Sequence, residues 1–227
     1  MAPHSESLCR ERTRTSYNRS MFPAGTNSPP PHDAFAVLGL PRRFDLSLGD
    51  VQRAYLGKVL QAHPDAIGAE MLEDLDDASS LAADLNRAKA TLESDEARAN
   101  LLLGLLGGPA KEADKSLPDG FLMEIMEIRE QVDAALAAKG PEQAAERAKW
   151  KQWAQSHRAE YTKATCEMFQ RLEAATDTGR NAIARDVRRL LNAWRYIERM
   201  LEQLDETYDP AKADWKDGGP QTRSESR

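Results

Sequence analysis

The strongest constraint on the fold is an apolar stripe near the end of the chain, between residues 183 and 204. Its members recur at alternating steps of four and three, and they are Ile183, Val187, Leu190, Trp194, Ile197, Leu201 and Leu204. Because an α-helix has about 3.6 residues per turn, this spacing places all of these side chains along one face of a helix. Such a face is stable in water only when it packs on other apolar surface. The stripe therefore predicts a long helix within a helical bundle.

Two earlier segments complete the predicted bundle. One covers residues 120–138. The other has a comparable stripe, formed by Trp153, His157, Tyr161, Ala164, Met168 and Leu172. Breaks at Gly140-Pro141 and at residues 176–179 separate the three helices, because glycine and proline interrupt helical hydrogen bonding. We therefore predict a three-helix bundle over residues 120–207.

A helical hairpin is predicted ahead of the bundle. Ser47 and Asp50 have the spacing of an N-terminal capping pair, and an amphipathic helix of about four turns follows them. Pro64 ends this helix, because proline lacks an amide donor and restricts the residue before it. A second helical stripe begins after the loop, so we expect two antiparallel helices joined by a loop that contains His63-Pro64-Asp65.

The two helices of the hairpin each present one apolar stripe. The stripe residues are Leu48, Val51, Tyr55, Val59 and Ala62 on the first helix, and Ala78, Leu81, Leu85, Ala88 and Leu92 on the second. Residues 34–40 are expected to form one short helical turn that packs across the pair. Residues 95–106 are expected to form a short final helix.

The predicted fold class is all-α, a helical hairpin domain followed by a three-helix bundle. No segment of convincing length alternates between apolar and polar residues as a strand does. Gly107-Gly108-Pro109 begins a polar stretch that marks the internal boundary, and both ends of the chain have compositions that favour disorder. The expected divisions are a tail at 1–31, the hairpin domain at 32–108, a linker at 109–119, the bundle at 120–207 and a tail at 208–227.

Composition argues against two classes of partner. The formal net charge is −6 and no long basic run is present, which does not fit a general nucleic-acid-binding protein. No stretch approaches the roughly 18 consecutive apolar residues of a membrane-spanning helix. We therefore expect neither nucleic acid nor membrane as a partner. We expect a soluble protein of the cytoplasm, or of the mitochondrial matrix if the source is a eukaryote.

The residue types that bind metals are few and are not clustered. The two cysteines are Cys9 and Cys166, and no two of the four histidines have the i, i+4 spacing of a helical zinc site. We therefore predict no metal site and no cofactor.

His63-Pro64-Asp65 is the most informative tripeptide of the chain, because it falls between two antiparallel amphipathic helices. In the simplest interpretation it only ends a helix, with Asp65 capping the structure that follows. An acid-base role for His63 and Asp65 would need a nucleophile or a third group, and the sequence identifies none. We therefore predict no catalytic residues.

The hairpin domain resembles a J-domain. The resemblance lies in the run from Phe35 to Leu40, in a tyrosine eight residues before His63, and in the tripeptide itself. It implies that the loop and the preceding helix dock on a DnaK/HscA-type chaperone and trigger its ATP hydrolysis. The implied chaperone-binding residues are Tyr55, His63, Pro64, Asp65, Arg53 and Lys58. Arg53 and Lys58 would supply a positive face that steers the encounter, unless they form a merely solvated helix face.

The chain as a whole is similar to the HscB type of co-chaperone. The similarity lies in the run from Phe121 to Glu130, together with Leu85-Asn86-Arg87-Ala88 and Ala97-Arg98-Ala99 ahead of it. In that family a carboxy-terminal three-helix bundle holds the scaffold on which iron-sulfur clusters are built. The resemblance therefore implies two partners, a chaperone and an iron-sulfur cluster scaffold protein.

Helical geometry divides residues 121–136 into two faces. At about 100° per residue, one narrow arc faces the bundle, and it holds Phe121, Ile125, Ile128, Val132 and Leu136. Apolar residues off this arc need another partner, unless a second helix covers them. The resemblance implies that the off-arc residues Leu122, Met123, Met126, Glu127 and Glu130 contact the scaffold. Trp194, the nearest match to a further aromatic contact, belongs to the bundle stripe and is predicted to pack in the core.

These features together predict a co-chaperone that is not itself an enzyme. It would tether an iron-sulfur cluster scaffold to a chaperone and stimulate the ATPase of that chaperone. Two alternatives remain open at this point. One is a J-domain co-chaperone for other clients, and the other is a helical interaction protein without a chaperone partner.

Overall fold

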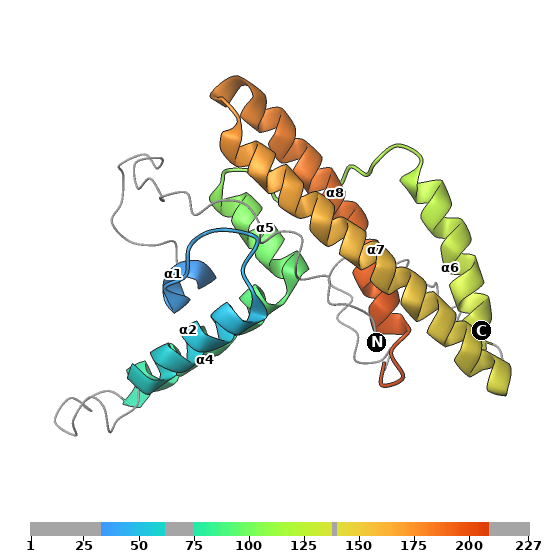
Figure 1. Cartoon of the computed structure of the whole chain (residues 1–227), viewed down its shortest axis with the longest axis horizontal. Coiled ribbons are helices and arrows are strands. Elements are labelled where there is room, and N and C mark those ends of the chain that lie inside the picture. Colours follow the sequence, from blue (N-terminus) through green and yellow to red (C-terminus); the bar gives the residue numbers. More distant parts are fainter. Residues whose placement is uncertain (1–32, 62–74, 138–139, 209–227) are drawn as a thin grey trace, which may run out of the picture.

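The computed structural model describes residues 33–61, 75–137 and 140–208, and within these ranges it contains seven α-helices and no strand (Figure 1). The helices are α1 (Ala34–Leu38), α2 (Leu48–Gln61), α4 (Leu75–Glu93), α5 (Asp95–Leu105), α6 (Phe121–Ala137), α7 (Pro141–Ala174) and α8 (Asp177–Gln203). This confirms the all-α fold class. The tripeptide His63-Pro64-Asp65 and nearly all of both predicted tails lie outside the described residues.

Local sequence sets the start of the first two helices. Oδ1 of Asp33 accepts hydrogen bonds from the amides of Phe35 and Ala36 at 3.0 and 3.3 Å, which caps α1. The predicted capping pair begins α2, where the amide of Asp50 donates to Oγ of Ser47 at 3.1 Å. These caps fix the ends of two helices whose apolar faces then pack together.

The hairpin consists of α2 and α4, which lie side by side and antiparallel, with α1 packed across them (Figure 1). The buried residues between these helices are Phe35, Leu38, Val51, Leu85, Ala88 and Leu92. The predicted stripes were wrong for Leu48 and Leu81, whose exposed fractions are 53% and 46%. Leu48 is exposed because it is the first residue of α2. Leu81 is exposed because α1 is only five residues long and covers only part of the stripe on α4.

The bundle consists of α6, α7 and α8, as predicted. The two long helices α7 and α8 run antiparallel, and the shorter α6 packs on both of them (Figure 1). The stripe on α8 is buried at Val187, Trp194, Ile197, Leu201 and Leu204, and half-buried at Ile183 and Leu190. The spacing of three and four therefore gave the correct face of this helix.

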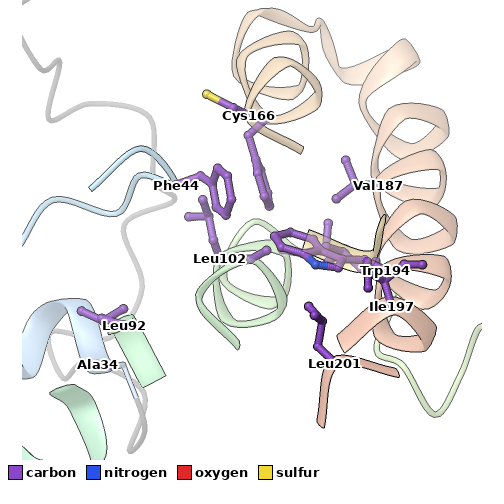
Figure 2. Close-up of a cluster of buried hydrophobic side chains, with 14 of the residues drawn as sticks. Ala34, Phe44, Leu92, Leu102, Cys166, Val187, Trp194, Ile197 and Leu201 are labelled. Carbon is purple, nitrogen blue, oxygen red and sulfur yellow. The ribbon is translucent and has the colours of Figure 1, made fainter. Parts of the chain in front are cut away.

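The hairpin and the bundle share one hydrophobic core. Phe44, from the segment between α1 and α2, packs on Phe169 of α7 and Trp194 of α8, at centroid distances of 5.7 and 6.4 Å. Figure 2 shows Phe44 and Trp194 approaching each other, with Leu102 of α5 beside them. Burial of an aromatic side chain stabilises a fold by about 2–3 kcal/mol. Packing therefore fixes the position of the hairpin relative to the bundle.

Arg98 of α5 holds the segment that contains Phe44. Its Nε donates to the Phe44 carbonyl at 2.8 Å, and its guanidinium lies 5.2 Å from the Phe44 ring centroid. The other guanidinium nitrogens donate to the Leu92 carbonyl and to the Asp95 carboxylate. Arg98 is only 3% exposed, and this burial lowers its pKa while Asp95 opposes the shift. A charge buried this deeply is tolerated because its donors are hydrogen-bonded.

The segment at 109–119, predicted to be a linker, is bonded to α8. Nε of Arg188 donates to the Pro109 carbonyl at 2.9 Å, and its Nη1 donates to Oδ1 of Asn100 at 2.7 Å. Asn192 donates to two further carbonyls of the segment, at 3.0 and 2.9 Å. The segment therefore follows the surface of α8 between the two parts of the molecule.

Replacement of the buried guanidinium tests this junction. We expect Arg98→Met to lower the free energy of unfolding by about 2–4 kcal/mol, because the carbonyls of Phe44 and Leu92 would be buried without donors. Urea denaturation followed by circular dichroism measures the loss. Arg87→Met, which removes an exposed partner of Asp84, is the matched control and should cost less than about 0.5 kcal/mol. Equal losses in the two variants would contradict the structural role of Arg98.

Candidate partner-binding surfaces

Tyr55, a predicted chaperone-binding residue, is half-buried between α2 and α4. Its hydroxyl donates to Oδ1 of Asn86 at 2.8 Å, and Nζ of Lys89 lies 5.0 Å from its ring centroid. Both contacts are to α4, so Tyr55 fastens the two helices of the hairpin together. Its geometry fits a residue that positions the predicted docking helix.

Arg53 and Lys58 are not brought together on one face. Arg53 is exposed and pairs with Asp50 one turn earlier. Lys58 is half-buried and lies against the end of α1, where a Cβ atom built on Gly39 would be 3.7 Å from its Cε. Five residues separate the two side chains, which corresponds to about 140° around the helix. The structure therefore has two separate positive charges on α2 in place of the predicted positive face.

The predicted loop residues His63, Pro64 and Asp65 lie outside the described residues, and their role stays a prediction. The flanking helices show where the segment begins and ends. α2 ends at Gln61 and α4 begins at Leu75, and both ends lie at the end of the hairpin that is remote from α7 and α8 (Figure 1).

Sequence reasoning missed two apolar residues on the outer side of the hairpin. Leu56 and Leu60 of α2 are exposed, and they lie four residues apart on the side of the helix that faces away from α4. Arg53 is their neighbour on this side. Both residues could have been identified from the sequence, because they are apolar and fall outside the predicted stripe of α2. Leu122 and Met126 were identified in this way on their own helix.

The surface predicted to bind the scaffold is open. Leu122, Met123 and Met126 are 50%, 73% and 57% exposed, and Glu127 and Glu130 beside them are exposed as well. We call these five residues the α6 surface. The alternative that a second helix covers this face is wrong for the described part of the chain. Whether the α6 surface binds a partner stays a prediction.

The opposite side of α6 fixes the orientation of this surface. Ile125 and Val132 are buried, and the other members of the predicted arc are half-buried against the core. Phe121 packs edge-on against Tyr196 of α8, with ring centroids 5.6 Å apart. Trp194 is fully buried, as its place in the stripe predicts. The aromatic residue of α8 beside α6 is therefore Tyr196.

In the described ranges, no cluster of three or more histidine, cysteine, aspartate or glutamate side chains has the geometry to hold a metal ion. A search of the described helices finds none with the length and hydropathy needed to cross a lipid bilayer.

Comparison with known proteins finds co-chaperones of the HscB type among the relatives of this chain. The chain is 38% identical over 106 residues to a co-chaperone protein HscB homolog of Chromobacterium violaceum, covering 46% of this chain and 61% of that protein. It is 31% identical over 182 residues to an HscB homolog of Aromatoleum aromaticum, covering 78% of this chain and 94% of the relative. The first match thus spans about three fifths of the relative, and the second spans nearly all of it. No family model matches the chain.

A solved structure has the same arrangement of helices. The crystal structure of the human co-chaperone protein HscB matches with a TM-score of 0.60 and 20% sequence identity. The match covers 85% of this chain and 92% of the human chain. At this identity the likeness shows a shared fold.

The two sides of α6 should respond differently to truncation. We expect Met123→Ala/Met126→Ala to change the free energy of unfolding by less than about 0.5 kcal/mol, because both side chains are exposed. Ile125→Ala on the same helix should cost about 2–4 kcal/mol, because it leaves a cavity in the core. Chemical denaturation of the three proteins measures the difference. A large loss in the double variant would mean that the two methionines are part of the core.

Proposed function

The chain belongs to the HscB family of co-chaperones, and from this premise we propose that it is a J-type adaptor of iron-sulfur cluster assembly. Its hairpin would bind a DnaK/HscA-type chaperone, and its α6 surface would bind the iron-sulfur cluster scaffold protein. ATP would be hydrolysed by the chaperone, so the adaptor itself supplies no catalytic residue. The observation that carries the proposal is the exposure of three large apolar side chains on a helix whose other side is buried.

The scaffold would bind the α6 surface through apolar contact and charge. Leu122, Met123 and Met126 offer an apolar strip, and methionine adapts to a partner because its side chain is flexible and polarizable. Glu127 and Glu130 border the strip and would orient a partner that has basic residues next to its own apolar patch. A packed bundle holds this helix in place, so little conformational entropy is lost on binding.

The chaperone would bind the outer side of the hairpin and the loop beyond it. His63, Pro64 and Asp65 come soon after the end of α2 in the sequence, and the family resemblance is the support for their part in triggering ATP hydrolysis. Tyr55 would act by holding α2 on α4. Arg53 offers one exposed charge that Asp50 partly offsets, and Lys58 lies on another side of the helix. We therefore propose that electrostatic steering contributes less to chaperone binding than a continuous basic face would.

The proposed mechanism is simultaneous tethering. The hairpin and α6 lie on different sides of the α7–α8 pair, so one partner need not displace the other (Figure 1). Because the shared core fixes the two parts, the adaptor would hold scaffold and chaperone at one spacing and raise their effective concentration. The loop would then trigger ATP hydrolysis by the chaperone while the scaffold is bound.

ATP turnover by the cognate chaperone, measured with and without the scaffold, tests the two surfaces separately. His63→Gln should stimulate poorly in both conditions. Met123→Ala/Met126→Ala should keep the stimulation seen without scaffold, lose the scaffold-dependent increment, and bind the scaffold about tenfold or more weakly.

Leu81→Ala is the matched control, because Leu81 is an exposed apolar residue of α4, and no residue assigned to either surface lies on α4. It should behave as the wild type. A uniform response of all four proteins would contradict the adaptor proposal. A normal response of the double methionine variant alone would reject the α6 surface and favour a J-domain co-chaperone for other clients.

A further inference from the structure

A shallow groove separates α6 from α8 next to the α6 surface. Its lining residues are Ile125, Arg129, Val132, Tyr196, Arg199, Met200 and Gln203. Three apolar side chains form its floor, and the polar ends of the other four provide hydrogen-bond donors around it. The groove is shallow and open to solvent, so the end of a side chain that projects from a docked protein could enter it.

The charged side chains that line the groove are both arginines. Arg129 and Arg199 line it from opposite helices, and no carboxylate is among its lining residues in the described part of the chain. Both arginines are half-buried. The structure records no ion pair for Arg129 within the described residues. A guanidinium beside an apolar floor is less hydrated than one in open solvent, so a carboxylate placed there would bind more strongly than at a fully exposed site.

The groove is continuous with the α6 surface. Arg129 lies three residues after Met126, and Ile125 lies three residues after Leu122, so each pair is adjacent on the helix. Tyr196, which lines the groove, also packs on Phe121 at the start of the same helix. A protein seated on Leu122 and Met126 would therefore reach the groove without any change in the backbone.

We propose that the groove receives an aspartate or glutamate side chain of the scaffold that binds the α6 surface. This inference rests on the proposed function. The complete interface then has three parallel parts: an acidic edge at Glu127 and Glu130, an apolar strip, and a basic groove at Arg129 and Arg199. The scaffold would present the complementary order, with basic residues on one side of its apolar patch and a carboxylate on the other. Such an order fixes the orientation of the partner as well as its affinity.

The test is the dissociation constant of the purified scaffold protein for the full-length chain, measured by calorimetry over a range of salt concentrations. Arg129→Gln should weaken binding about three- to thirtyfold at low salt and should reduce the salt dependence. Arg185→Gln should change neither quantity, because this exposed arginine lies about 21 Å along α8 from Arg199. Circular dichroism checks that both variants are folded as the wild type is.

A charge exchange then identifies the carboxylate. Arg129→Glu should abolish most of the binding, and one carboxylate-to-lysine substitution on the scaffold surface should restore it. If no such substitution restores binding, or if Arg129→Gln binds as the wild type does, the groove inference is overturned. Arg129-dependent binding to vesicles of phosphatidylcholine and phosphatidylserine, without scaffold, would also overturn it in favour of a lipid anion.

The outcomes separate this inference from the proposed function. Loss of binding in Met123→Ala/Met126→Ala with normal binding in Arg129→Gln would keep the adaptor and reject the groove. Normal binding in both variants, or no binding by the wild type, would reject both.

Discussion

The packing of Phe44 on α7 and α8 is the contact on which the arrangement of the molecule depends. It joins a short segment of the hairpin domain to the core of the bundle, and Arg98 holds the same segment by its backbone. A polar contact adds to it, since Arg195 of α8 pairs with Glu96 of α5 at 3.2 Å. Burial raises the pKa of Glu96, and Arg195 opposes this rise. Apolar and polar contacts thus agree on one relative position of hairpin and bundle.

A fixed junction has a direct consequence for an adaptor. Two binding surfaces on a rigid body keep one separation, so binding of the first partner places the second without the entropy loss of ordering a flexible linker. The segment at 109–119 supports this rigidity, because Arg188 and Asn192 bond its carbonyls to α8. Neither the hairpin nor the α6 surface is covered by the junction. In the proposed adaptor, both could therefore be occupied while the core stays intact.

Much of this fold follows from the sequence by helical geometry, and the exceptions have physical causes. The stripe at residues 183–204 and the exposure of the α6 surface both follow from about 100° of rotation per residue. Phe44 was not predictable, because it lies in a short non-helical segment where no periodicity assigns a side chain to the core. Leu81 was assigned wrongly, because periodicity gives the face of a helix and not the length of its neighbours. The separation of Arg53 and Lys58 also follows from this rotation, because five residues correspond to about 140° around α2.

We propose that one rigid molecule offers two separate surfaces to two partners. The methionine methyl groups of the protein provide a probe of each surface. Met123 and Met126 lie on the α6 surface, Met71 belongs to the segment between α2 and α4, and Met200 is buried in the core. The most direct measurement is a methyl NMR spectrum of isotope-labelled methionines, titrated first with scaffold and then with chaperone. We expect scaffold to shift Met123 and Met126 and to leave Met71 unchanged, and chaperone to shift Met71 while the first two keep their scaffold-bound positions. A spectrum in which scaffold leaves Met123 and Met126 unchanged, or in which chaperone displaces it from them, would contradict the claim.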